Sequence, residues 1–250
     1  MCIRDSISPD LINWYLSLGI DMREGWGMTE TAGVGTAFYS REIKLGHVGR
    51  AVNESEVRIA QDGEILFRGP GVFCGYLNKP EQTKETLIDG WLHTGDVGEI
   101  DNYGNLKITD RKKDIIITAG GKNISPSEIE NELKFSPFIS DAVVIGDKRK
   151  FLSCLIMIDE ENVMKHAQDN DIPFSNFESL CKSEEIVTLI DDEVNKVNKK
   201  FASVEQVKKF SLIDIQLTAE DDELTPTMKL KRKFINQKYG DIIESMYQSA

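Results

Sequence analysis

Apolar and polar residues alternate along several short stretches in the middle of the chain. The alternation runs through 97–101 and again through 106–110, and the turn-forming sequence Asn-Tyr-Gly-Asn lies between them. Because successive strand residues point to opposite faces, this pattern predicts a β-hairpin. The same alternation predicts further short strands at 56–59, 63–68 and 71–76. Together these segments predict a small β-barrel-like subdomain over residues 46–110.

The start and the end of the chain follow different patterns. Apolar residues at helical spacing over 11–18 precede a strand-like stretch, which is typical of the end of an α/β layer. Towards the C-terminus, the apolar runs Ala142–Ile145 and Leu152–Ile158 predict buried strands. Apolar residues at helical spacing from Ile186 to Val204 predict one long amphipathic helix.

Signals for one further strand and one further helix lie between these regions. Ile115-Ile116-Ile117 predicts a short buried strand. The sequence Ser125-Pro126-Ser127-Glu128 is a capping box with proline at the first helical position, so a helix is predicted to begin there. Its predicted apolar positions are Ile129, Leu133 and Phe135.

The predicted fold class is therefore α/β plus α+β. Residues 1–45 are expected to end a large α/β subdomain, 46–110 to form the β-barrel-like subdomain, and 114–250 to form an α+β domain. The boundary falls in the charged segment 111–113, which has no apolar anchor. We therefore expect few packing contacts to resist rotation there.

Composition excludes several classes of function. The net charge of −12 and pI of about 4.8 argue against broad nucleic-acid binding, which favours a basic surface. The three histidines and four cysteines show no metal-ligand spacing, and the cysteines are typical of reduced, mostly buried thiols in a cytosolic protein. No apolar run approaches the roughly 20 residues of a membrane span.

The hairpin carries the first candidate chemistry. If its turn is centred on Tyr103-Gly104, Asp96 and Arg111 lie opposite each other at its open end. A carboxylate that accepts and a guanidinium that donates are suited to a ligand with vicinal hydroxyls, such as a ribose. The alternative is a plain cross-strand salt bridge, and this is the preferred interpretation when the pair is considered by itself.

A second cluster follows the first helical pattern, at Trp26-Gly27-Met28-Thr29-Glu30. An aromatic ring, a glycine, a hydroxyl and a carboxylate suit an adenine face, a close backbone approach, a phosphate contact and Mg²⁺ coordination. The alternative is a tryptophan-capped strand end followed by a Thr-Glu helix start.

Two longer motifs resemble one protein family. GWLHTGDVG at 90–98 and DRKKDIIITAGGKNISP at 110–126 resemble the adenylate-forming acyl-CoA synthetases, most closely their long-chain fatty acid branch. The resemblance implies that Asp96 binds ribose, with Arg111 beside it. It also implies that Lys113 is the pivot of a mobile C-terminal lid domain, and that Gly120 and Gly121 line the route of the CoA arm.

The resemblance also assigns roles to the second cluster. Trp26 stands where the family has a tyrosine and is expected to stack on adenine, with Gly27 beside it. Thr29 is expected to contact phosphate and Glu30 to bind magnesium. Lys229, near the C-terminus, is expected to neutralise charge during adenylation, although Met228 replaces the family's glycine before it. The alternative for the basic residues 229–233 is a solvated helix start or a weak contact with anionic lipid.

The implied reaction uses ATP, Mg²⁺ and CoA. A long-chain fatty acid and MgATP give an acyl-adenylate, and the CoA thiol then displaces AMP. The family's upstream phosphate loop has no counterpart here, so we expect a C-terminal part of a larger enzyme that does not adenylate alone. Met1–Ser6 also has no counterpart in the family, so Met1 is expected to be an assembly scar rather than the biological start.

Two other functions remain open at this point. One is an aryl- or short-chain acyl-CoA ligase of the same superfamily, and the other is a non-catalytic nucleotide-binding or interaction module. The expected location is the cytoplasm, with peripheral contact at the inner membrane surface through 229–233 as an additional hypothesis. The bend around Cys74, in GPGVFCGYLN at 69–78, is interpreted as structural, with Cys74 as a small core residue.

Overall fold

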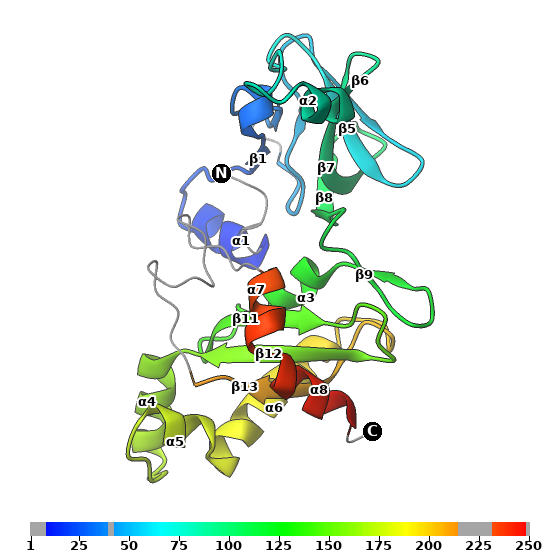
Figure 1. The fold of residues 1–250 in the computed structure, drawn as a ribbon. Helices are drawn as coiled ribbons and strands as arrows, with labels where there is room; N and C mark the ends of the chain where they lie inside the picture. The colour runs from blue at the N-terminus through cyan, green and yellow to red at the C-terminus, as the bar shows by residue number, and fades with distance from the viewer. Residues whose placement is uncertain (1–8, 40–42, 215–231, 249–250) are drawn as a thin grey trace. The chain divides into compact units, whose positions relative to one another are not determined.

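A computed structural model describes residues 9–39, 43–214 and 232–248 of the chain. The chain forms two compact units, Met1–Ile115 and Ile116–Ala250 (Figure 1). Within the described ranges, no helix is both long enough and apolar enough to cross a membrane.

Unit 1 begins with a helix and a small antiparallel sheet. Its three strands are joined in the order β1–β2–β3, and each is two residues long. The elements are α1 (Pro9–Ser17), β1 (Gly25–Trp26), the 3-10 helix η2 (Thr29–Thr31), β2 (Thr36–Ala37) and β3 (Arg50–Ala51).

A five-stranded antiparallel sheet follows, built around β7. Strand β5 runs along one edge of β7, whereas β6 and β8 share the other edge. The sheet is open rather than closed into a barrel. Its elements are β4 (Glu56–Ile59), β5 (Glu64–Arg68), α2 (Pro80–Thr86), β6 (Leu87–Ile88), β7 (Trp91–Ile100) and β8 (Leu106–Arg111).

The core of unit 1 lies against this sheet. Side chains from β1, β5, β7 and β8 meet there, namely Trp26, Ile65, Phe67, Leu92 and Leu106. Trp26 and Phe67 contact each other edge to face, with ring centroids 5.8 Å apart. Strand β1 is therefore packed onto the larger sheet, although it belongs to a separate one.

The strand predicted at 71–76 is wrong, since this segment forms turns and bends. The amide of Phe73 donates to the carbonyl of Glu30 at 2.9 Å instead of joining a strand ladder. Gly75 adopts φ +145°, which side-chain-bearing residues rarely adopt. Cys74, within this bend, is exposed, so its prediction as a core residue is also wrong.

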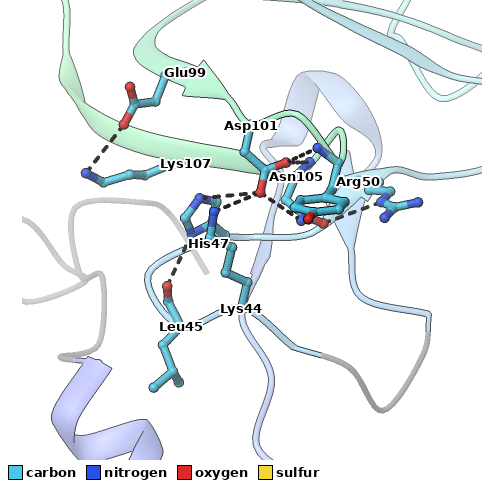
Figure 2. Close-up of polar contacts among 9 residues, drawn as sticks. Lys44, Leu45, His47, Arg50, Glu99, Asp101, Asn105 and Lys107 are labelled. Atoms are coloured by element: carbon cyan, nitrogen blue, oxygen red, sulfur yellow. Dashed lines mark hydrogen bonds and ion pairs between the residues drawn. The ribbon is translucent and has the colours of Figure 1, made fainter.

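The turn between β7 and β8 is fixed by Asp101. Its Oδ1 accepts from the amides of Tyr103 at 2.9 Å and Asn105 at 2.8 Å. Its Oδ2 accepts from Asn105 Nδ2 at 3.1 Å and from Lys44 Nζ at 2.9 Å. Figure 2 shows Lys44 and His47, from the segment before β3, directed towards this carboxylate. The Lys44 ammonium is the main cause that holds the pKa of Asp101 well below its usual range.

Unit 2 contains a three-stranded sheet with helices on both faces. Strand β12 is central, antiparallel to β11 and parallel to β13. In chain order the elements are β9 (Ile116–Ile117), β10 (Asn123–Ile124), α3 (Pro126–Leu133), β11 (Ile139–Ile145), β12 (Leu152–Ile158), α4 (Glu160–Asp169), α5 (Phe177–Cys181), α6 (Glu184–Asn198), β13 (Val207–Leu212), α7 (Arg232–Lys238) and α8 (Gly240–Gln248).

The central strand β12 is buried at every position, as its predominantly apolar sequence predicts. Leu152, Cys154 and Ile156 face a core with α3, α4, α5 and α6. Leu155 and Met157 face a smaller core with α7 and α8 (Figure 1). The predicted buried strands at 142–145 and 152–158 are therefore confirmed.

Two helix ends differ from the predicted pattern. Helix α3 begins at Pro126 as predicted but ends at Leu133, and Phe135 beyond it is 53% exposed. Helix α6 ends at Asn198, so Val204 lies outside it and is 55% exposed. The side chain of Asn198 ends α6 because it bonds both the amide and the carbonyl of Val207, each at 2.9 Å.

Candidate active site

The open end of the β7–β8 hairpin brings Asp96 and Arg111 together, as the sequence predicts. The two residues are direct partners in the strand register. Arg111 Nε lies 2.6 Å from Asp96 Oδ1. The carboxylate is completely buried, whereas the arginine side chain is about one-third exposed.

A third residue, which the sequence did not connect to this pair, completes the site. Trp26 Nε1 donates a hydrogen bond to Asp96 Oδ2 at 2.9 Å. The two carboxylate oxygens of Asp96 thus face two different partners, a guanidinium and an indole. Trp26 and Asp96 are separated by 70 positions in the chain, and only tertiary packing brings them together.

Trp26, the residue predicted to stack on adenine, is buried in this structure. Its side chain is 1% exposed and belongs to the core of unit 1. A Cβ on Gly35 would lie 2.5 Å from Trp26 Cζ3, so Gly35 leaves the space that the ring fills. In this conformation, therefore, the ring offers no open face to adenine.

The loop after Trp26 is shaped by its own backbone contacts. A Cβ on Gly27 would lie 2.0 Å from the carbonyl oxygen of Gly33, so only glycine fits there. Thr29 is exposed, and Glu30 is half-buried. The internal packing of the loop is thus sufficient to explain Gly27.

Glu30 is held from the bend that follows β5. Tyr76 Oη donates to Glu30 Oε1 at 2.7 Å. Burial, and then the bond to Glu30, raises the pKa of Tyr76. Sequence reasoning assigned Tyr76 only to a structural bend, and no signal in the sequence links residues 46 positions apart. Among the described residues, no group of three or more His, Cys, Asp or Glu could hold a metal ion, so Glu30 is a single candidate ligand.

A second buried carboxylate, Glu64, lies beside the hairpin. Its oxygens accept from the amide of Gly95 at 2.9 Å and from Lys112 Nζ at 3.0 Å, and they lie 3.1 Å from His93 Nδ1. Burial alone raises the pKa of Glu64, but the bonds with His93, Lys112 and Gly95 outweigh it, and the pKa is lowered.

The same network of ion pairs includes residues of the predicted hinge segment. Lys112 Nζ also lies 2.6 Å from Asp62 Oδ2, and these contacts raise the pKa of Lys112. Arg111 and Lys112 are both held by carboxylates, which are polar contacts that the absence of an apolar anchor at 111–113 did not indicate. Lys113 is exposed.

The remaining predicted residues lie elsewhere in the chain. Gly120 and Gly121 occupy the exposed turn between β9 and β10 in unit 2, where Gly121 adopts φ +75°. Its amide closes the turn on the carbonyl of Thr118 at 2.8 Å. Lys229 and Lys231 lie outside the described residues. Unit 1 therefore brings Trp26, Asp96 and Arg111 into one cluster and joins Glu30 to Tyr76.

Relatives with similar sequences cover nearly the whole chain. It is 39% identical over 236 residues to the long-chain-fatty-acid–CoA ligase FadD15 of Mycobacterium tuberculosis, covering 94% of this chain and 39% of that protein. It is 36% identical over an alignment of 268 positions to the long-chain-fatty-acid–CoA ligase ACSBG2 of Xenopus laevis, covering 98% of this chain and 36% of that protein. The chain thus spans less than half the length of these relatives.

Solved structures show a similar fold. O-succinylbenzoate CoA synthetase (MenE) of Bacillus subtilis, in complex with ATP and magnesium, matches with a TM-score of 0.68 and 28% identity, over 90% of this chain and 43% of that chain. The adenylation domain of a carboxylate reductase from Mycobacterium chelonae matches with a TM-score of 0.76 over 97% of this chain and 37% of that chain. Its identity of 23% supports the fold alone.

Two family models match the chain directly. The AMP-binding enzyme model matches residues 1–77, and the model of the AMP-binding enzyme C-terminal domain matches residues 113–250, which is more than half of the chain. The chain therefore belongs to the AMP-binding enzyme family.

Proposed function

We propose that this chain supplies one side of the nucleotide site in an AMP-forming long-chain fatty acid–CoA ligase. The observation that carries the proposal is the pairing of Asp96 with Arg111 at the open end of the hairpin. A carboxylate that accepts from vicinal hydroxyls, beside a guanidinium that donates to them, is suited to the ribose of ATP and AMP.

The proposed reaction has two steps. The fatty acid carboxylate attacks the α-phosphate of MgATP, and pyrophosphate leaves. The CoA thiol then attacks the acyl carbonyl and releases AMP. The residues position the reactants and neutralise charge rather than form a covalent bond. Thr29 contacts phosphate, Glu30 binds Mg²⁺ together with the phosphates, and Lys229 neutralises charge at the α-phosphate.

The substrate class follows from the relatives. The ligases at 39% and 36% identity are named for long-chain fatty acids. An aryl substrate is the second candidate, because solved structures with similar folds include an o-succinylbenzoate CoA synthetase at 28% identity. The higher identity favours the long-chain acid. CoA is the thiol substrate, and Gly120 and Gly121 line its route.

The proposal includes a pivot at Lys113. The contacts of Lys112 with Asp62 and Glu64 tie the chain to unit 1 up to that residue. Rotation of residues 114–250 between an adenylating and a thioester-forming orientation therefore begins at Lys113. The proposed location is the cytoplasm, with peripheral membrane contact through 229–233.

A chimera tests this function. The segment of the M. tuberculosis relative that aligns with this chain is exchanged for it, and fatty-acid-dependent ATP–pyrophosphate exchange and acyl-CoA formation are measured. We expect both activities. Asp96→Asn in the chimera should lower the exchange rate by about tenfold or more, the effect of losing a hydrogen bond to a charged group.

The lysine assignment provides a matched control. Lys229→Ala should reduce the exchange rate by about a hundredfold or more, the scale of an electrostatic contact in a transition state, whereas Lys231→Ala should leave it near that of the parent chimera. A folded chimera without exchange activity contradicts the proposal. The opposite result for the two lysines contradicts the role of Lys229.

A further inference from the structure

The indole of Trp26 occupies the position that the proposed function requires for a ribose hydroxyl. Its N–H donates to Asp96 Oδ2 at 2.9 Å. Asp96 has no exposed surface, and Trp26 is 1% exposed. In this conformation the carboxylate therefore offers no open surface to a ribose.

The contact has a clear physical reason in the unliganded protein. A buried carboxylate that lacks hydrogen-bond donors is strongly unfavourable. Arg111 faces one oxygen of Asp96, and the Trp26 N–H satisfies the other. A ribose O–H and an indole N–H are both donors, so either one satisfies this oxygen.

We propose that Trp26 is an internal substitute for the ribose and gates the nucleotide site. In the closed state the indole is bonded to Asp96. In the open state the indole leaves, a ribose hydroxyl takes its bond, and the released ring stacks on adenine. The inference rests on the proposed assignment of Asp96 to ribose.

The strand that carries Trp26 is short, and this is where the proposed movement would begin. Strand β1 is two residues long and pairs with β2 over two positions, and Gly25 and Gly27 flank Trp26. Gly35 lies directly against the ring, where a Cβ would come within 2.5 Å of Trp26 Cζ3. Opening breaks one hydrogen bond and the edge-to-face contact with Phe67, and it withdraws the indole from the core of unit 1. The closed population reduces the apparent affinity for nucleotide in proportion to the fraction that is open.

The first test is isothermal titration of the 250-residue chain with AMP, comparing wild type with Trp26→Phe. Phenylalanine keeps an aromatic ring but has no N–H to compete for Asp96. We expect Trp26→Phe to bind AMP about tenfold more tightly, which corresponds to one hydrogen bond to a charged group. Adding Asp96→Asn to Trp26→Phe should remove this gain. Equal or weaker binding by Trp26→Phe overturns the gate, because the indole would then hold Asp96 in place for the ligand.

The second test does not depend on the folding of a Trp26 variant. The substitutions Trp14→Phe and Trp91→Phe leave Trp26 as the sole tryptophan of the chain. AMP should quench its fluorescence as the ring stacks on adenine, whereas 2′,3′-dideoxy-AMP, which lacks both hydroxyls, should not. Binding of AMP without a change in the emission of Trp26 overturns the gate.

The two proposals fail in different ways. If AMP binds in an Asp96-dependent manner without opening Trp26, the gate fails and the ribose assignment stands. If no variant binds AMP, the gate is overturned, and the activity of the chimera decides the proposed function.

Discussion

Three groups converge on the buried carboxylate of Glu64: the Gly95 amide, the His93 imidazole and the Lys112 ammonium. The contacts join β5 to β7 and to the segment after β8. A carboxylate is suited to this position because its two oxygens accept several bonds at once. Glu64 thereby holds in place the strand that carries Asp96.

Glu64→Gln should destabilise unit 1 at neutral pH. The pKa of Glu64 is lowered in the folded protein. Its contribution is therefore fully present above the ordinary value of 4.5 and is lost as the pH falls through the lower folded value. We expect a loss of about 1–3 kcal/mol in the free energy of unfolding at neutral pH, which narrows in acid. Urea unfolding followed by tryptophan fluorescence, at neutral pH and in acid, measures this loss of stability.

Glu99→Gln, on the neighbouring strand β7, is the matched control. Its side chain is 67% exposed and pairs with Lys107 at 3.5 Å, so its effect should stay within about 0.5 kcal/mol. A difference between wild type and Glu64→Gln that does not narrow in acid would show that shape, not charge, explains the effect.

Local pattern explains which residue contacts were predictable. Strand alternation and a tight turn predict the hairpin, and both signals lie within one short stretch, but Asp96 faces Arg111 through a register shift between Val97 and Gly98. The bonds from Trp26 to Asp96 and from Tyr76 to Glu30 join residues 70 and 46 positions apart. Such contacts depend on how sheets and bends pack, which alternation does not encode.

At the scale of elements, the hairpin depends on its turn. Asp101 bonds the amides of Tyr103 and Asn105 and the ammonium of Lys44. The first two bonds shape the turn, and the third ties it to the segment before β3. The turn fixes the register of β7 against β8 as far as Gly98 and Ile108, and a register shift between Val97 and Gly98 then places Asp96 opposite Arg111.

Substitutions at Asp101 should separate these two roles. Asp101→Ala loses both the bonds to the backbone amides and the ion pair with Lys44, so it should lower the melting temperature of unit 1 the most. Asp101→Asn keeps an oxygen for the two amides and should lie between Ala and wild type. Lys44→Met removes only the ion pair, so its effect should shrink at high salt. Thermal melts monitored by tryptophan fluorescence at low and high salt compare them. Equal losses for Ala and Asn would contradict the role of the backbone bonds.

The elements themselves were predictable where one pattern dominated. Strand β12 is apolar at every position except Ser153 and is buried throughout. The end of α6 was missed because apolar residues continue beyond Asn198, while the side chain of Asn198 turns the chain towards β13. The segment 71–76 alternates like a strand, but its glycines and its bond to Glu30 bend it.

At the scale of the whole molecule, the two units have separate cores. The core of unit 1 is built around Trp26 and Phe67, and the cores of unit 2 lie on the two faces of β12. All three tryptophans, Trp14, Trp26 and Trp91, belong to unit 1. Tryptophan fluorescence therefore reports on unit 1, whereas most described helical residues, and so most of the far-UV circular dichroism, belong to unit 2.

Leu155→Ala should destabilise unit 2 alone. Leu155 is completely buried in the core with α7 and α8, so its truncation should remove about 2–5 kcal/mol. We expect the urea midpoint seen by circular dichroism to fall and that seen by fluorescence to stay. Leu92→Ala, buried in unit 1, should shift the fluorescence midpoint instead. If Leu155→Ala shifts both midpoints equally, the units unfold as one.

The bond between Trp26 and Asp96 sets a trade-off between stability and activity. In the proposed gate, the same hydrogen bond contributes to the folded state of unit 1 and opposes its ligand. Any substitution that strengthens this bond stabilises the unliganded protein and weakens the binding of the nucleotide by the same free energy. Selection for heat resistance alone would therefore favour variants with a more stable closed state. Selection for turnover would favour variants in which unit 1 is less stable.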